Sequence, residues 1–256
     1  MKKKNEPFIV VKDLSLDYGG DVIVRDVNFT VNSGDIFVIM GMSGCGKSTI
    51  MRSIIGLLAP THGHIFIDGT DIWALDSDAR TKIIGQFGIS FQSGALFSSM
   101  TIGENIALGL ELKTELTRQE INRRVREKLK LVGLDGTENL YPSEISGGMI
   151  KRAALARALI NDPEVLFFDE PSAGLDPVRS AELDELIKCI NHRAGTTIVM
   201  VTHELPTIMT IATNSVYLDA RTRTVAASGA PKQILKTTKN PQVIDFLTRG
   251  HKGGKQ

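Results

Sequence analysis

A glycine-rich segment between an apolar strand and a helix constrains this chain more than any other feature. The run Asp35–Met40 (DIFVIM) predicts a buried strand, glycines recur over residues 41–46, and a helix is predicted from Ser48 to about Leu58. Together with Lys47 this is the pattern G-x-x-x-x-G-K-[ST] of a P-loop, in the position between strand and helix that its mechanism requires. The alternative is a glycine-rich turn with an incidental lysine, which the flanking strand and helix disfavour.

The chemistry expected of this loop is phosphate binding. Glycines let backbone N–H groups converge on phosphate oxygens, and the start of the following helix adds a favourable partial charge. Lys47 is predicted to neutralise the β- and γ-phosphates and Ser48 to ligate Mg²⁺, whereas Cys45 fills a variable position and is interpreted as a packing residue. The residues predicted to surround the nucleotide phosphates are Gly41, Met42, Ser43, Gly44, Cys45, Gly46, Lys47, Ser48 and Thr49.

A second apolar strand carries two carboxylates at its end. Val165–Phe168 is followed by Asp169 and Glu170, and ligands of open α/β sheets bind at the carboxyl ends of strands. Asp169 suits the Mg²⁺-binding role of a Walker-B aspartate, and Glu170 could polarise an attacking water as general base. Taken alone, the pair could equally be two solvated acids; a P-loop in the same chain favours the catalytic interpretation.

Strands and helices alternate along most of the chain. Residues 8–17 and 22–31 alternate in strand fashion around the turn residues 19–21, residues 64–68 resemble another strand, a helix is expected from Pro177 to about Arg193, a strand at 196–201, and a helix after Glu204. Such alternation predicts a parallel sheet covered on both faces.

The chain changes character between about residues 101 and 160, where strand signals vanish. Residues 117–132 place Ile121, Val125, Leu129 and Val132 on one helical face, and the Arg and Lys residues between them are interpreted as the solvated face. We therefore expect one domain over residues 1–256, with a helical subdomain at about 93–160 inserted into an α/β core and a frayed tail at 250–256.

Composition excludes several classes of protein. Lys plus Arg count 30 and Asp plus Glu 29, so a nucleic-acid partner held by bulk positive charge is not expected. The two cysteines, Cys45 and Cys189, show no metal-ligand spacing and fit a reducing cytosol. The basic start lacks an apolar segment after it, so no secretory signal is expected, and no run approaches the ~18 apolar residues that cross a bilayer. If the protein acts on a membrane, another chain must span it.

A third motif narrows the family. Ile145–Met149 (ISGGM) precedes an alanine-rich helix and resembles the ABC signature motif, whose common form is LSGGQ. Ser146 is a good N-cap, and Gly147 and Gly148 leave backbone donors open to an anion at the helix start. A capped helix without function is the alternative if the motif stood alone.

Further positions support the resemblance to ABC ATPases. Gln92 follows a strand-like run at 87–91 as the Q-loop glutamine does, Asp176 ends a segment similar to the D-loop, and His203 matches the switch histidine that contacts the γ-phosphate. Tyr18 stands where the family places an aromatic residue that stacks on adenine. The alternatives are a structural histidine and a tyrosine that packs at the end of an edge strand.

Membership of this family would imply a P-loop (RecA-like) parallel-sheet α/β core, an N-terminal antiparallel β subdomain and an inserted α-helical subdomain. It would also imply ATP as substrate, Mg²⁺ held by Ser48, Gln92 and Asp169, and a head-to-tail dimer of two copies in which each ATP lies between the P-loop of one chain and the signature motif of the other. The sequence contains no obvious arginine finger, which agrees with electrostatic help from a partner's helix N-terminus.

Three segments resemble the ATPases of Mla-type phospholipid transport in particular: Phe91–Phe97, Pro142–Met149 and Arg152–Arg157. A terminal helix at 240–247 also fits that group. The resemblance implies phospholipid trafficking between membranes with an integral permease and an MCE-domain protein, and a cytoplasmic location, peripheral on the cytoplasmic face of the inner membrane.

Two other functions stay open. One is the ATPase of a small-solute importer, for example for an amino acid, and the other is a soluble ABC ATPase acting on ribosomes or DNA. Near the permease, Leu96 and Phe97 are candidates for apolar contact, or equally for local core.

Overall fold

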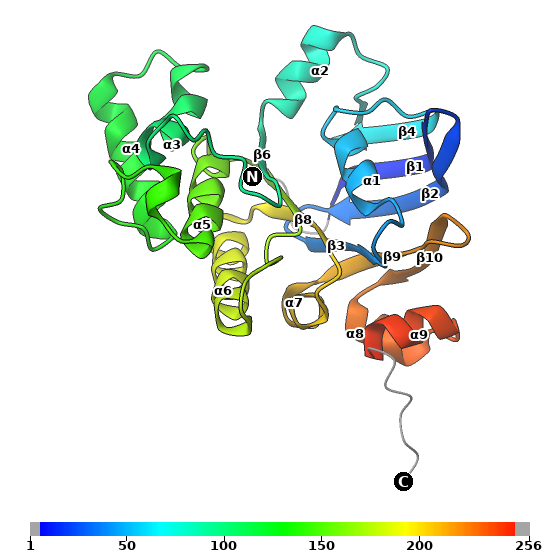
Figure 1. Cartoon of the computed structure of the whole chain (residues 1–256). Helices are drawn as coiled ribbons and strands as arrows, with labels where there is room; N and C mark the ends of the chain where they lie inside the picture. Colours follow the sequence, from blue (N-terminus) through cyan, green and yellow to red (C-terminus); the bar gives the residue numbers. More distant parts are fainter. Residues whose placement is uncertain (1–5, 249–256) are drawn as a thin grey trace.

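The computed structural model describes residues 6–248, so the tail predicted as frayed lies outside the described residues. A six-stranded sheet in the order β10-β9-β3-β8-β7-β6 forms the centre (Figure 1). Its strands are β3 (Ile36–Gly41), β6 (Phe87–Ser90), β7 (Val165–Asp169), β8 (Thr197–Thr202), β9 (Asn214–Asp219) and β10 (Thr224–Gly229). All neighbours pair in parallel except β10, which runs antiparallel to β9.

The central strands are buried on both faces, as their unbroken apolar runs predict. Along β3, alternate side chains enter two different cores: Val38 and Met40 pack with the helices α3 to α9, whereas Phe37 and Ile39 pack with α1 and the second sheet. The fold-class prediction of a parallel sheet covered on both sides is confirmed. Because the strands are parallel, their carboxyl ends meet at one edge.

The second sheet is antiparallel, with strand order β2-β1-β4-β5. It consists of β1 (Pro7–Tyr18), β2 (Asp21–Asn32), β4 (His62–Ile67) and β5 (Thr70–Asp71). The strands expected at 8–17 and 22–31 are confirmed, joined by the two-residue turn Gly19-Gly20, where both glycines have positive φ. This is the expected N-terminal antiparallel β subdomain.

The helices are α1 (Lys47–Ile54), α2 (Ser77–Ile84), α3 (Ile102–Glu111), α4 (Arg118–Leu131), α5 (Gly147–Ala158), α6 (Pro177–Ala194), α7 (Leu205–Ile211), α8 (Pro231–Thr237) and α9 (Pro241–Thr248), with a short 3₁₀ turn at Pro142–Glu144. Helices α3, α4 and α5 pack on one another between β6 and β7, in the stretch predicted as an inserted helical subdomain. The exact subdomain bounds of about 93–160 stay a prediction. Each of the three helices begins at a Ser or Thr N-cap, worth about 1 kcal/mol.

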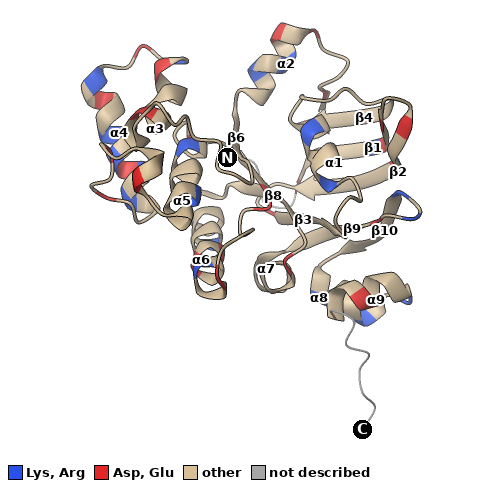
Figure 2. Cartoon of the chain, in the orientation of Figure 1, with Lys and Arg blue, Asp and Glu red and all other residues tan. Residues whose placement is uncertain are grey.

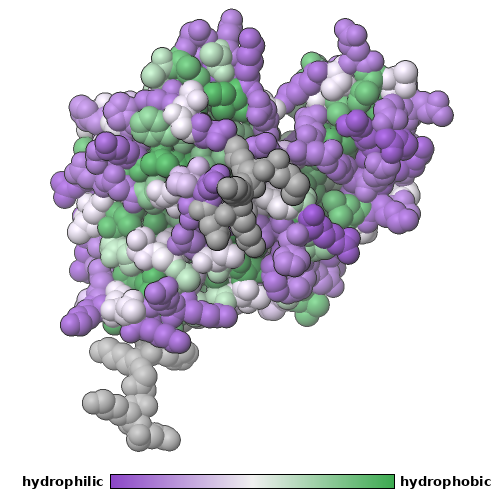
Figure 3. Space-filling view, turned by 180° about the vertical axis from the view of Figure 1, so that it is seen from behind, coloured by the Kyte–Doolittle hydropathy of each residue, from purple (hydrophilic) through white to green (hydrophobic). Residues whose placement is uncertain are grey.

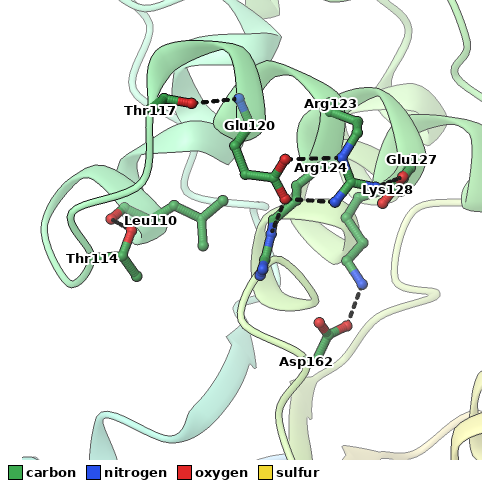
Figure 4. A network of polar contacts seen from close by, with 9 residues as sticks. All are labelled: Leu110, Thr114, Thr117, Glu120, Arg123, Arg124, Glu127, Lys128 and Asp162. Atoms are coloured by element: carbon green, nitrogen blue, oxygen red, sulfur yellow. Dashed lines mark hydrogen bonds and ion pairs between the residues drawn. The ribbon is translucent and has the colours of Figure 1, made fainter.

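Helix α4 has one buried apolar face and one charged face. Ile121, Val125 and Leu129 are buried, as their spacing predicts. On the opposite face Glu120 binds two arginines, and Lys128 pairs with Asp162 of the α5–β7 connection (Figure 4). Charged residues are dense on α4, whereas β3 and β8 carry almost none (Figure 2). The basic run of this helix is therefore a paired, solvated surface, as predicted.

Two parts of the sequence-based description need correction. Helix α1 ends at Ile54 rather than near Leu58, because Gly56 adopts φ 77 and Leu57 N–H bonds back to Arg52 O, which closes the helix. Elements between residues 70 and 86 and between 212 and 239, namely β5, α2, β9, β10 and α8, were not predicted.

Seen from behind, the molecule has two lobes separated by a notch, one with α2 and the antiparallel sheet and one with α3 and α4 (Figure 3). Within residues 6–248, no helix has the length and apolar character required to cross a membrane.

Candidate functional site

The P-loop joins β3 to α1 and wraps the first turn of that helix. Gly46 is the N-cap of α1 with φ 99, a conformation that L side chains rarely adopt, and an added Cβ would lie 2.6 Å from Val24 of β2. Glycine is therefore required here by backbone shape and by contact. Gly41 and Cys45 are buried, whereas Met42, Ser43 and Gly44 are exposed at the mouth of the loop.

Lys47 is buried, with 6% of its surface exposed. Its Nζ donates hydrogen bonds of 3.0 Å to the carbonyl oxygens of Gly41 and Met42. The ammonium is thus held within the loop by backbone dipoles, which satisfies a charge that burial would otherwise penalise. In this position it can transfer its donors to phosphate oxygens at the loop mouth.

The predicted magnesium ligands of the P-loop and of β7 are in contact. Ser48 Oγ donates to Asp169 Oδ1 at 2.9 Å. Burial raises the pKa of the Asp169 carboxyl and the neighbouring Glu170 charge adds to the rise, while the Ser48 hydrogen bond opposes it. Two neighbouring oxygen groups, a hydroxyl and a carboxylate, fit Mg²⁺, which takes few protein ligands and completes its shell with phosphate and water. Residues 6–248 contain no cluster of three or more His, Cys, Asp and Glu side chains that would hold a metal by protein ligands alone.

Glu170 has a strained backbone and a carboxylate with one hydrogen-bonding partner at each oxygen. Its φ is 49, in the left-handed region, which costs a non-glycine residue about 1–2 kcal/mol. The backbone N–H donates to Val201 O at 2.8 Å, and Oε2 accepts from the Thr202 hydroxyl at 3.2 Å. Glu170 has 9% of its surface exposed. Strain of this kind persists because surrounding contacts fix it, and it is common where a side chain must be aimed.

His203 lies beside Glu170, with Nδ1 2.8 Å from Glu170 Oε1. They stand at the carboxyl ends of the adjacent strands β8 and β7, so the sheet itself brings them together. Half of the His203 side chain is exposed, and its Nε2 is directed away from Glu170, 3.9 Å from the Glu204 carboxylate. The arrangement fixes the orientation of the Glu170 carboxylate and leaves the second imidazole nitrogen exposed, which agrees with the predicted roles of both residues; these roles stay predictions.

Tyr18 stands at the end of β1 with 75% of its surface exposed. A ring this exposed is not a core residue of the edge strand. Its exposure agrees with the predicted role as a stacking platform, which stays a prediction.

The signature residues form a separate surface at the start of α5. Ser146 is the N-cap and its Oγ accepts from Met149 N–H, as the sequence predicts. Ser146 and Gly147 are exposed. Gly147 and Gly148 line a hollow of about 350 Å³ together with Gln92 and Asp176. The structure thus brings Gln92 to the signature residues; a metal-binding role for Gln92 stays a prediction.

Asp176 is the N-cap of α6 and lies on this same surface. Its Oδ1 accepts hydrogen bonds from the backbone N–H groups of Arg179 and Val178, both at 3.0 Å. These bonds lower the pKa of the Asp176 carboxyl, and the bond from Arg179 has the largest effect. The Arg179 guanidinium pairs with Asp176 at 3.3 Å. The arginine also flanks Gly148, so a positive charge borders the signature motif.

Several residues of the site were missed from sequence. Thr202 supports Glu170, Arg157 donates to the carbonyls of Gly94 and Ala95 just after Gln92, and Lys151 binds the turn that follows Glu170. Thr202 directly precedes His203 and could have been noted for that reason. Arg157 and Lys151 lie on a helix where basic residues normally face solvent, so no local signal identified them.

The predicted residues therefore fall into two groups. Lys47, Ser48, Asp169, Glu170 and His203 converge at the edge where β3, β7 and β8 end. The signature residues, Gln92 and Asp176 gather near the start of α5, which Figure 1 shows on the opposite side of the central strands from α1.

Comparison with known proteins agrees with this arrangement. The family model described as "ABC transporter" matches residues 24–173. The chain is 38% identical over 247 residues to the intermembrane phospholipid transport system ATP-binding protein MlaF of Escherichia coli K12, a match that covers 96% of this chain and 91% of that protein. It is 44% identical over 239 residues to a probable ribonucleotide transport ATP-binding protein, mkl, of Mycobacterium leprae, covering 93% of this chain and 68% of that longer protein.

Among solved structures, the chain resembles the dimeric post-hydrolysis state of the ATP-binding cassette MJ0796 bound to ADP and Pi. The TM-score is 0.78 at 31% sequence identity, with 87% of this chain and 98% of that chain covered.

Proposed function

Because the chain belongs to the ABC transporter family and is an ATPase of that family, we propose that it powers phospholipid movement between membranes through a separate permease. The observation that carries the enzymatic part is the meeting of Ser48, Asp169, Glu170 and His203 at one edge of the sheet, with contacts of 2.8–2.9 Å. The lipid assignment rests on the match of nearly full length to MlaF, supported by the ISGGM form of the signature.

In the proposed reaction, Lys47 and the P-loop N–H groups bind the β- and γ-phosphates of ATP. Ser48 and Asp169, which are in contact, would hold Mg²⁺, whose charge would offset that of the phosphates; Gln92, which lies with the signature residues, would have to approach them to act as a further ligand. Glu170 accepts the proton of the attacking water, with Thr202 and His203 fixing the orientation of its carboxylate. His203 uses its accessible Nε2 to contact the γ-phosphate.

We propose that the catalytic unit is a head-to-tail dimer of two copies. In one chain the signature residues lie apart from the P-loop, and Ser146 and Gly147 are exposed. A helix start lined with glycines and bordered by Arg179 offers the positive field that the γ-phosphate needs, and a second copy can bring it there. The resemblance to a dimeric cassette supports this geometry.

The proposed permease contact lies in the connection between β6 and α3. Phe97 is 53% exposed, whereas Leu96 packs against the helical core, so of the two predicted contacts Phe97 is the one available to a partner. Asn105, fully buried, binds both the N–H and the C=O of Phe97 and fixes the loop that presents it. With such a permease, and with an MCE-domain protein as further partner, the chain would lie on the cytoplasmic face of the inner membrane. Nothing in the charge balance favours a nucleic-acid partner.

A second candidate function is solute transport. The relative named as a ribonucleotide transport protein favours it, although the chain spans about two thirds of that protein's length. The amino-acid importer considered above has no such support among these relatives.

Affinity purification of the Glu170→Gln chain from its native membranes tests the proposal. The variant should bind ATP, hydrolyse it very slowly and stay dimeric, so its partners remain attached. Mass spectrometry that finds a polytopic permease, an MCE-domain protein and phospholipid supports the lipid function. A permease with a soluble solute-binding protein would transfer the assignment to solute transport, and ribosomal proteins or DNA would overturn the transport proposal.

A further inference from the structure

A lysine of the signature helix reaches the segment that follows the predicted catalytic base. Lys151 lies on α5, five residues after the N-cap Ser146, and its Nζ donates to the carbonyl oxygens of Pro171 at 2.7 Å and Ala173 at 2.6 Å. Burial lowers the pKa of Lys151, while the Glu170 carboxylate opposes this. A partly desolvated ammonium with two short bonds to carbonyls is a directed contact, unlike a lysine extended into solvent.

The two carbonyls bracket a tight turn that begins at Glu170. Within this turn Ala173 N–H bonds to Glu170 O at 3.2 Å and Leu175 N–H to Ser172 O at 3.0 Å. Ser172 is 3% exposed, and its hydroxyl has no hydrogen-bond partner within residues 6–248. The Lys151 ammonium therefore supplies directed polar contacts from α5 to the turn, beside the burial of Pro171 and Ser172.

The position of this turn determines the position of Glu170. The left-handed backbone at Glu170 is fixed upstream by the bond from its N–H to Val201 O of β8. Downstream, the hold is the 3.2 Å turn bond and the two bonds from Lys151 to the residues after it. If the lysine bonds are lost, the turn bond alone remains downstream of Glu170, and the orientation of the carboxylate is less firmly fixed even though Thr202 and His203 still contact it.

We propose that Lys151 is a positioning residue that links helix α5 to the turn after Glu170. When a second copy binds to the signature residues at the start of α5, this link would fix the position of Glu170 in the chain that carries Lys151. The inference rests on the proposed dimer, in which the start of α5 meets the partner's nucleotide. Lys151 touches no substrate. It connects the surface used for one nucleotide to the base used for the other, and thereby couples the two sites of the dimer.

The experiment compares three variants of the full-length chain, at concentrations at which the Glu170→Gln chain forms its ATP dimer. Lys151→Met removes the ammonium and keeps the length of the side chain. Lys151→Arg restores a cation able to donate to both carbonyls. Lys128→Met is the matched control, because Lys128 is also a partly buried lysine of the helical block but pairs with Asp162 (Figure 4) rather than with the turn.

Three quantities are measured: kcat, the Kd of the monomer for ATP, and ATP-driven dimerisation in the Glu170→Gln background. We expect Lys151→Met to lower kcat roughly 10-fold or more, because a small misplacement of a base is costly, and to leave the Kd and dimerisation within about twofold. Lys151→Arg should recover at least about half of kcat, and Lys128→Met should resemble the wild type.

Two results would overturn the inference. One is a Lys151→Met chain with wild-type kcat. The other is a chain that loses ATP binding, dimerisation and thermal stability together without rescue by arginine, which would make Lys151 a general structural residue. If the wild-type chain does not hydrolyse ATP and the Glu170→Gln chain does not dimerise with ATP, the proposed function itself is wrong.

Discussion

The P-loop and the signature motif each lead into a helix through glycines, yet the fold prepares them differently. In the P-loop, Lys47 is 6% exposed and already bonded to loop carbonyls, and Ser48 is bonded to Asp169. At the signature motif, Ser146 and Gly147 are exposed and the side chain of Asp176 is 52% exposed. The first region is organised by its own chain, whereas the second presents an open surface. We therefore expect that changes at the signature surface reduce ATP turnover without weakening ATP binding to the single chain.

The largest effect is expected from Lys47→Ala. The ammonium is the principal positive charge of the P-loop, so its loss should weaken ATP binding to the monomer by about 100-fold or more. Isothermal titration with ATP measures this directly. ATP affinity within threefold of the wild type would mean that the P-loop region does not determine affinity.

Gly147→Asp tests the other side of the comparison. An added Cβ at Gly147 meets nothing within 4 Å, and an acid in the first turn of a helix is favourable, so the chain should fold normally. The new carboxylate would repel the phosphates of a partner's nucleotide. We expect monomer affinity for ATP within about twofold of the wild type and an ATPase rate lower by about 100-fold.

Gly147→Ala is the control for side-chain volume and should lose less activity than Gly147→Asp. A Gly147→Asp chain with normal turnover would show that the signature surface does not approach phosphate.

Tyr18→Ala should have an intermediate effect. Because the ring is exposed, its loss should change the free energy of unfolding by less than about 0.5 kcal/mol. If the ring stacks on adenine, ATP affinity falls about 10-fold, while Tyr18→Phe retains most of it. Binding of ATP and of inorganic triphosphate by both variants separates base stacking from phosphate contact. An equal loss for the two ligands would contradict the stacking role.

The smallest effect on nucleotide chemistry is expected at Asp184, which lies outside both regions. It joins α6 to α7 by accepting a 3.0 Å hydrogen bond from Thr207, and burial raises its pKa to about 6. The charges of Glu185, Lys188 and Glu204 also act on it. The folded chain thus binds this proton more tightly than the unfolded chain, whose Asp pKa is about 3.9. Its contribution to the free energy of unfolding therefore decreases as pH rises from about 4 to about 7.

Asp184→Asn removes this titration. Relative to the wild type, the variant should gain stability by about 2 kcal/mol between pH 4.5 and pH 8 in urea unfolding, with ATP affinity unchanged. The same stability difference at both pH values would show that Asp184 does not titrate in this range.

Contiguous patterns explain what could be predicted from the sequence. The P-loop, the carboxylates after β7 and the face of α4 depend on residues near one another in the chain. Helix α2 escaped prediction because it buries no residue and so has no amphipathic period. The contacts of Lys151 join residues 20 and 22 positions apart, and a helical lysine has the same local sequence whether it faces solvent or a carbonyl. The exposure of Tyr18 and Phe97 likewise depends on tertiary packing, which periodicity does not describe.

The open signature surface also has a kinetic consequence. If a complete site requires the P-loop of one chain and the signature motif of another, then at low protein concentration turnover depends on the square of the concentration of the chain. A membrane partner that holds two copies side by side replaces this bimolecular encounter with a local, intramolecular one at a high effective concentration. Free chains released from that partner would then consume little ATP, so the geometry of a single exposed helix start confines energy use to the assembled transporter.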